Sequence, residues 1–165
     1  MAKKLKIGII GSGGIAQGAH MPGYASLPEL CEMVWACDID PNVAEEAAEK
    51  FGGMKTTGDY RDVIADPEVD AVSIATPNKY HVEPTIAALE AGKHVLCEKP
   101  LAMNAEEARS MVRAARKSGL ILQVGMNNRF TGPAQFMKQY IDDGNLGDVY
   151  YARAQALRRI GRAHV

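Results

Sequence analysis

Six residues near the N-terminus have the composition and spacing of a loop that holds phosphate groups. Gly11-Ser12-Gly13-Gly14-Ile15-Ala16 fits the pattern G-x-G-x-x-G/A, after an apolar run from Leu5 to Ile10 and before an expected helix from Ile15 onward. The first glycine permits a tight turn, the second lets the backbone approach a pyrophosphate, and the last small residue keeps the helix close to the sheet. Glycines also occur in ordinary turns, but in this context the loop predicts dinucleotide binding.

An acidic residue follows the loop at the distance that such a site requires. Asp38 ends the next apolar run, Glu32 to Asp38, and its carboxylate could accept hydrogen bonds from the ribose hydroxyls of the adenosine. Asp40 is better explained as a helix N-cap, because Pro41 follows it. Asp38-Ile39-Asp40 has no neighbouring Lys or Arg, and its two carboxylates would repel a 2′-phosphate. The sequence therefore favours NAD over NADP.

Two further polar segments follow strand ends. Thr76-Pro77-Asn78-Lys79-Tyr80-His81 comes after one expected strand, and Cys97-Glu98-Lys99-Pro100 comes after another. The carboxyl ends of parallel strands share one edge, where ligands bind. A lysine beside a cofactor at that edge can give or take a proton. By spacing alone, Lys99 fits a surface turn equally well.

Strands and helices alternate along most of the chain, which predicts a parallel sheet with helices on both faces. Residues 1–125 are thus expected to form a Rossmann-type, doubly wound α/β domain. After Gly125 the pattern changes to one helix, Pro133 to Ile141, and one strand candidate, Val149 to Leu157. The expected strands of the first domain are Leu5 to Ile10, Glu32 to Asp38, Lys55 to Thr57, Val69 to Ala75, His94 to Cys97 and Leu120 to Val124; its later helices start after Asp40, at Val82 and after Asn104.

Composition narrows the possible partners. The 165 residues carry a formal net charge of −1, which gives no electrostatic reason to expect nucleic acid or an anionic membrane. No apolar stretch approaches the roughly 18 residues of a membrane span. The three cysteines, Cys31, Cys37 and Cys97, match no zinc pattern and are expected to be free buried thiols in a reducing compartment. We therefore expect a cytoplasmic protein without a metal.

Three groups of residues together resemble the Gfo/Idh/MocA family of NAD(P)-dependent sugar oxidoreductases. They are Gly11 to Ala16, then Ala75-Thr76-Pro77-Asn78 with His81, then Ala91-Gly92-Lys93-His94-Val95 running into Glu98-Lys99-Pro100. The resemblance implies that Lys99 is the catalytic lysine and that a sugar or polyol is the substrate. It also places Glu98 and Asn127 near the cofactor or substrate, and Thr76, Pro77 and Asn78 along the dinucleotide cleft. His81 is either a cofactor-site residue or, as we prefer, a structural histidine at a helix start.

Members of this family are roughly twice as long as these 165 residues. Their second half is an α+β domain whose open sheet covers the substrate and usually supplies a further acid and a histidine. Residues 126–165 are expected to be the first helix and strand of that domain. Three functions stay open: an active oxidoreductase, a nucleotide-binding remnant without turnover, or a fragment that needs a separate substrate domain.

A lone strand needs partners for its N–H and C=O groups. The strand candidate Val149 to Leu157 is therefore expected to pair with a second copy of the chain, which predicts a homodimer.

Overall fold

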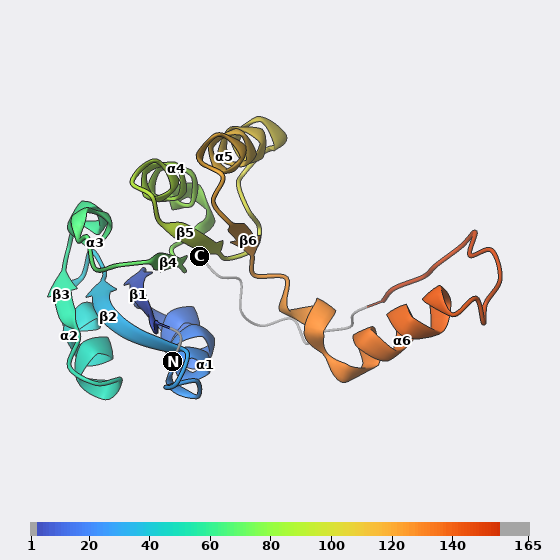
Figure 1. The fold of residues 1–165 in the computed structure, drawn as a ribbon, viewed down its shortest axis with the longest axis horizontal. Coiled ribbons are helices and arrows are strands. Elements are labelled where there is room, and N and C mark those ends of the chain that lie inside the picture. Colours follow the sequence, from blue (N-terminus) through green and yellow to red (C-terminus); the bar gives the residue numbers. More distant parts are fainter. Residues whose placement is uncertain (1–2, 156–165) are drawn as a thin grey trace. The chain divides into compact units, whose positions relative to one another are not determined.

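The computed structural model describes residues 3–155 (Figure 1). The chain divides into two compact units, Met1–Met126 and Asn127–Val165, which we describe separately. Unit 1 is built on six strands that are all parallel, in the order β3-β2-β1-β4-β5-β6. This is the order of a dinucleotide-binding sheet, and it confirms the doubly wound α/β prediction. The strands are β1 Leu5–Ile10, β2 Cys31–Cys37, β3 Lys55–Thr57, β4 Ala71–Ile74, β5 His94–Cys97 and β6 Leu122–Val124.

Helices cover both faces of this sheet, as Figure 1 shows for α4 and α5 on one side and α1 and α2 on the other. Each face has its own hydrophobic core, because every central strand is buried on both sides. Ile9 and Ile74 have no exposed surface, on β1 and β4 respectively. The helical elements of unit 1 are η1 Ala16–His20, α1 Met21–Ala25, α2 Pro41–Lys50, α3 Tyr60–Ala65, η2 Asn78–Tyr80, α4 Val82–Glu90 and α5 Ala105–Ser118.

Local sequence signals account for most helix boundaries. The Asp40 carboxylate accepts a hydrogen bond from Asn42 N–H at the start of α2, which confirms the predicted cap. The Asn104 side chain likewise accepts a hydrogen bond from Glu107 N–H, and Gly119 ends α5 in the left-handed conformation. Helix α3 has six residues and is capped by Asp59, and it was not predicted from the sequence.

Helix α3 packs on the sheet because β1 has a glycine where the two meet. A methyl group at Gly8 would lie 2.3 Å from Cγ1 of Val63, a fully buried side chain of α3. The absence of a side chain at Gly8 thus lets a short helix cover the middle of the sheet.

Unit 2 contains a 3₁₀ turn, η3 Asn127–Phe130, and one α-helix, α6 Gly132–Asp142. The helix confirms the predicted one, but the strand prediction is wrong for the part that is described. Residues 149–155 form no strand, and residues 156–157 lie outside the described part of the chain. The alternating pattern was insufficient because a strand also needs a neighbour that offers hydrogen bonds, and residues 127–155 include no other strand.

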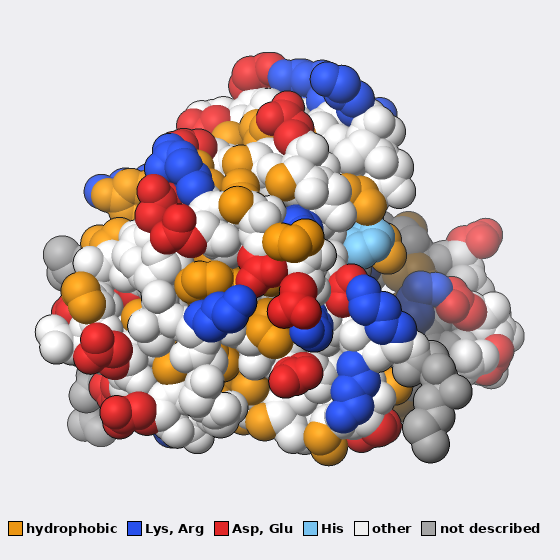
Figure 2. All heavy atoms as spheres, turned by 60° about the vertical axis from the view of Figure 1, so that its left-hand side comes forward, with side chains coloured by type: hydrophobic (Ala, Val, Ile, Leu, Met, Phe, Trp, Pro, Cys, Tyr) orange, Lys and Arg blue, Asp and Glu red, His pale blue; other side chains and the backbone are white. Residues whose placement is uncertain are grey.

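The surface of the molecule carries charges of both signs. Figure 2 shows one face, on which acidic and basic side chains are interspersed with small groups of hydrophobic atoms. In the part of the chain that is described, none of the helices has the length and apolar character needed to cross a bilayer.

Candidate functional site

The glycine loop lies where the strand order reverses direction, between β1 and β4. Gly11 N–H donates to Cys37 O on one side (2.8 Å), and Ala75 N–H donates to Ile10 O on the other (2.8 Å). Gly11 has φ +86°, and a methyl group there would lie 2.7 Å from Thr76 N and 2.8 Å from the Ala75 carbonyl carbon. Only glycine fits this position, for both its backbone angle and its surroundings. In doubly wound sheets ligands bind at this switch point.

The next two glycines are open to the outside. Methyl groups at Gly13 and Gly14 would meet no atom within 4 Å. Gly14 and Ile15 are already helical, and Ala16 is fully buried against the sheet. The first N–H groups of a helix have no partner within it, so they are available to an anion in front of the loop. This open space in front of a helix start fits the pyrophosphate of a dinucleotide.

Asp38 is held in place by backbone N–H groups. Its Oδ2 accepts a hydrogen bond from Ser12 N–H (3.0 Å), and its Oδ1 accepts one from Asp40 N–H (3.1 Å). Ser12 is fully buried, and its hydroxyl donates to Cys37 O (3.2 Å). The carboxylate is therefore fixed at the carboxyl end of β2, beside the glycine loop, where a ribose would extend from the pyrophosphate.

The loop after β4 lies at the same edge of the sheet. Pro77 and Asn78 are exposed, and Thr76 is half-buried next to Gly11. His81 has no exposed surface, and its Nδ1 and Nε2 each lie 2.9 Å from a carbonyl oxygen, those of Pro100 and Thr76 respectively. Both ring nitrogens are thus occupied by the backbone, so this ring joins the loop after β4 to the turn after β5.

The turn after β5 carries the candidate catalytic lysine. Lys99 is exposed, and its backbone N–H donates to Oε2 of Glu98 (3.0 Å). Glu98 N–H donates to Ile74 O (2.9 Å), which continues the pairing between β4 and β5. The fold thus brings the Lys99 turn and the loop at residues 76–78 to the edge of the sheet where the glycine loop lies.

Three residues around Glu98 were not predicted from the sequence. The His20 ring connects Ser73 Oγ to Glu98, with Nδ1 2.7 Å from the hydroxyl and Nε2 3.0 Å from Oε1 of the carboxylate. A methyl group at Gly125 would lie 2.7 Å from the same Oε1. His20 is four positions after the buried Ala16, so helical spacing could have placed it on the inner face. Ser73 and Gly125 carry no comparable signal.

Two other sequence predictions concern the surroundings of the site. Asn127 begins unit 2, whereas the sheet edge belongs to unit 1, so its proximity to the cofactor stays a prediction. Cys31, Cys37 and Cys97 are free and buried, and burial raises the pKa of the Cys37 thiol to about 12 and that of Cys97 to about 11.

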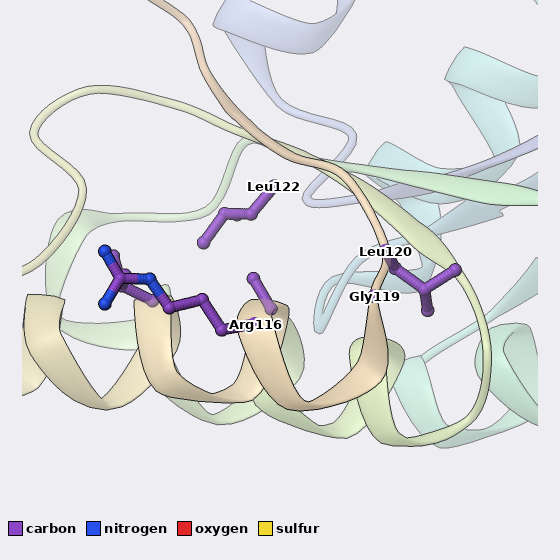
Figure 3. A pocket seen from close by; sticks show the side chains of 6 residues that line it. Arg116, Gly119, Leu120 and Leu122 are labelled. Atoms are coloured by element: carbon purple, nitrogen blue, oxygen red, sulfur yellow. The ribbon is translucent and has the colours of Figure 1, made fainter.

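The structure has a groove elsewhere that is unrelated to this edge. It lies between the end of α5 and the beginning of β6, as Figure 3 shows, with Arg116, Gly119, Leu120 and Leu122 among its lining residues. Because β6 begins there, the groove is at the amino end of the strand, whereas the glycine loop and Lys99 follow carboxyl ends.

Comparison with known proteins agrees with this geometry. The pattern of the Gfo/Idh/MocA group, described as an oxidoreductase family with an NAD-binding Rossmann fold, matches residues 5–126. D-Glucoside 3-dehydrogenase of Escherichia coli is 40% identical over 157 residues, which are 95% of this chain and 44% of that protein. Levoglucosan dehydrogenase of Pseudarthrobacter phenanthrenivorans is 38% identical over 94% of this chain and 42% of its own length.

Solved structures give the same result. Levoglucosan dehydrogenase in complex with NADH and levoglucosan superposes with a TM-score of 0.83 and 39% identity, over 88% of this chain and 41% of that one. The WlbA dehydrogenase from Bordetella pertussis, in complex with NADH and UDP-GlcNAcA, has a TM-score of 0.85 and 31% identity, over 91% of this chain and 44% of its own. The chain thus spans less than half the length of these relatives. It belongs to the Gfo/Idh/MocA family of oxidoreductases, which has an NAD-binding Rossmann fold.

Proposed function

We propose that this chain binds NAD and supplies the proton-transfer lysine for oxidation or reduction of a sugar or polyol. The observation that carries the proposal is the meeting of two features at one sheet edge. One is the glycine loop, with its open space at Gly13 and Gly14, and the other is the exposed Lys99 on the turn after β5.

The residues of the glycine loop and β2 would hold the dinucleotide. The open N-terminus of the helix after Gly13 would bind the pyrophosphate, and the fixed Asp38 carboxylate would accept hydrogen bonds from the adenosine ribose. Thr76, Pro77 and Asn78 would form the wall on the β4 side. The bound NAD supplies the hydride acceptor or, in the reverse direction, the hydride donor.

Lys99 would act on the substrate hydroxyl. Its side chain lies at the surface of unit 1 while its backbone is tied to Glu98, so the amine can reach a substrate at this edge from a fixed turn. In oxidation the amine takes the proton of the hydroxyl group while the hydride leaves the carbon that bears this group. In reduction the amine returns a proton to the same oxygen. The relatives named for D-glucosides and levoglucosan support a carbohydrate hydroxyl as the target.

Two measurements on one sample test this proposal. Calorimetric titration should show NAD binding at least about tenfold tighter than NADP, because Asp38 would repel a 2′-phosphate. Turnover is then measured with levoglucosan, D-glucosides and inositols. Lys99→Ala should lower kcat by about 10²–10⁴-fold and leave NAD binding unchanged. Lys117→Ala, a change at another exposed lysine, is the control. Equal turnover by Lys99→Ala and wild type would refute the role of Lys99.

A second candidate is NAD binding without turnover by these 165 residues alone. These 165 residues align with only 42–44% of the two dehydrogenases, so turnover by these residues alone is tested separately from NAD binding. A remnant would stay inactive under all conditions, whereas a fragment would gain activity when the rest of a relative's substrate-binding half is added as a separate protein. NAD binding with no turnover across the panel, with and without that addition, would favour the remnant.

We also propose that the chain forms a homodimer through unit 2 and works in the cytoplasm. Helix α6 exposes Phe136, Met137, Tyr140 and Ile141 along one side, an apolar surface that a second copy could cover. The three free thiols suit a reducing compartment. Light scattering should give twice the mass of the chain, and Phe136→Glu should give the single mass; a wild-type monomer at micromolar concentration would overturn the dimer.

A further inference from the structure

We infer that His20 is a positioning residue, which fixes the Lys99 turn by holding the carboxylate of Glu98. This inference rests on the proposed function, since it concerns the same lysine. His20 comes from the helix that follows the glycine loop, 78 residues before Glu98 in sequence. It would therefore connect the element that holds the nucleotide to the element that carries the proposed proton-transfer group.

The hydrogen bonds around the carboxylate form one continuous path. Oε2 of Glu98 accepts the backbone N–H of Lys99 (3.0 Å), and Oε1 lies 3.0 Å from Nε2 of His20. On the other side of the ring, Nδ1 lies 2.7 Å from the Ser73 hydroxyl. A neutral imidazole satisfies this pattern when Nε2–H donates to Glu98 and the Ser73 hydroxyl donates to Nδ1.

The His20 and Glu98 side chains are largely buried, so the loss of one hydrogen bond between them should matter. The side chains of His20 and Glu98 are only 6% and 17% exposed, so water replaces a lost partner poorly. A carboxylate in such a place requires donors, and His20 and the Lys99 N–H are the two that contact it among the described side-chain hydrogen bonds. Without His20 the carboxylate should turn towards solvent and release the Lys99 backbone.

The His20 ring lies on the inner side of its helix. Ala16–His20 is a π-helical turn, with Met21 N–H donating to Ala16 O, five residues earlier. A π-turn contains one more residue than an α-turn, and so shifts the following side chains by about 100° around the axis. As a result Ala16 and Met21, five residues apart, are both fully buried. His20 is four positions after Ala16 and lies on the same inner side, with its side chain 6% exposed. π-Helical turns are rare in proteins, and those that occur are often found at functional sites.

Gly125 also lies close to the Glu98 carboxylate. A methyl group there would lie 2.7 Å from Oε1 and 3.2 Å from Cδ of Glu98, both in the side chain. Gly125 does not have a positive φ, so alanine fits its backbone. Gly125→Ala should therefore displace the Glu98 carboxylate and leave the fold intact, which tests the same path without changing His20.

The first experiment needs neither cofactor nor turnover. Native-state hydrogen exchange, followed by NMR, should show the Lys99 amide exchanging about tenfold faster in His20→Ala and Gly125→Ala than in wild type. Amides of β1 and β4 should be unchanged, which reports an intact sheet. His94→Ala is the matched control, because the His94 Nδ1 accepts Ile121 N–H at the amino end of the strands. Unchanged exchange at Lys99 in both variants, with the sheet intact, would overturn the inference.

Conservative variants separate positioning from packing. The amide nitrogen of His20→Gln approximates Nε2 and should keep the hydrogen bond to Glu98, whereas that of His20→Asn approximates Nδ1 and should keep only the contact with Ser73. Gln should restore slow exchange at Lys99 and Asn should not. Equal behaviour of the two would mean that His20 fills space only, and would overturn the inference.

The second experiment uses the enzyme once a substrate has been found. His20→Ala should lower kcat about ten- to a hundredfold with little change in the Kd for NAD, and His20→Gln should recover most of the loss. If wild type has no turnover, the proposed function fails while the exchange result still stands on its own. If exchange at Lys99 rises and kcat does not fall, the functional part of the inference is wrong.

Discussion

The two halves of the candidate site are held together by different means. The glycine loop is fixed by backbone groups: Gly11 N–H bonds to Cys37 O, and Ser12 N–H bonds to Asp38. The Lys99 turn is fixed by buried histidine side chains that come from other elements, His20 on Glu98 and His81 on Pro100. The nucleotide half therefore depends on the backbone conformation at positions such as Gly11, whereas the reaction half depends on individual side-chain contacts.

The largest expected effect is that of Gly11→Ala, which attacks the backbone half directly. The new methyl group would lie 2.7 Å from Thr76 N, and φ of +86° is unfavourable for alanine. Neither strand end can move without breaking the sheet, so we expect a loss of roughly 2–4 kcal/mol in the free energy of unfolding, together with loss of NAD binding. Chemical denaturation and NADH fluorescence titration measure the two effects. Gly14→Ala, where nothing lies within 4 Å, is the control for stability; equal stability of Gly11→Ala and wild type would contradict the backbone account.

His81→Ala is the corresponding test of the side-chain half. It removes a fully buried ring whose nitrogens lie 2.9 Å from the carbonyl oxygens of Pro100 and Thr76. We expect a loss of roughly 2–3 kcal/mol in the free energy of unfolding and a lower kcat, since the turn that carries Lys99 loses one of its two supports. A loss of affinity for NAD with unchanged kcat would instead assign His81 to the nucleotide half.

Gly13→Ala should separate ligand binding from folding. A methyl group there contacts nothing in the protein, so thermal unfolding should shift by less than a degree or two. It would nevertheless occupy the space in which the pyrophosphate approaches the backbone, so we expect a roughly 10- to 100-fold weaker Kd for NADH, measured by fluorescence. Unchanged affinity would place the dinucleotide elsewhere.

The smallest expected effect is a difference in how often the two halves of the candidate site open. Cys37 lies beneath the glycine loop and Cys97 beneath the Lys99 turn, where Gly125 N–H donates to Cys97 O. Because burial raises their pKa values to about 12 and about 11, both thiols stay protonated at pH 8 and react only when the structure opens. NADH should slow labelling of Cys37 several-fold more than labelling of Cys97, as followed by mass spectrometry of peptides. Equal slowing would show that the two halves open as one unit.

The nucleotide half was readable from sequence because its requirements are local. Gly11 needs a left-handed backbone angle, Ala16 needs to be small, and Asp38 follows an apolar strand, so each requirement appears as a residue type at a fixed distance along the chain. The caps at Asp40 and Asn104 were predicted for the same reason. Helix α3 was missed because six residues are too few to show a helical period, although Asp59 marks its start.

The tertiary structure decided the contacts between residues that are far apart in sequence. The approach of His20 to Glu98 depends on the strand order, which brings β1, β4 and β5 together and leaves no mark in local composition. Residues 149–155 show the converse. Their alternating pattern predicted a strand, but they form none, because residues 127–155 include no neighbouring strand to share hydrogen bonds. The sequence by itself determined the strands and the nucleotide loop, because backbone angles and apolar periods are local properties. Only the folded chain determined how the Lys99 turn is held, because a buried polar side chain takes whichever partner the packing brings within reach.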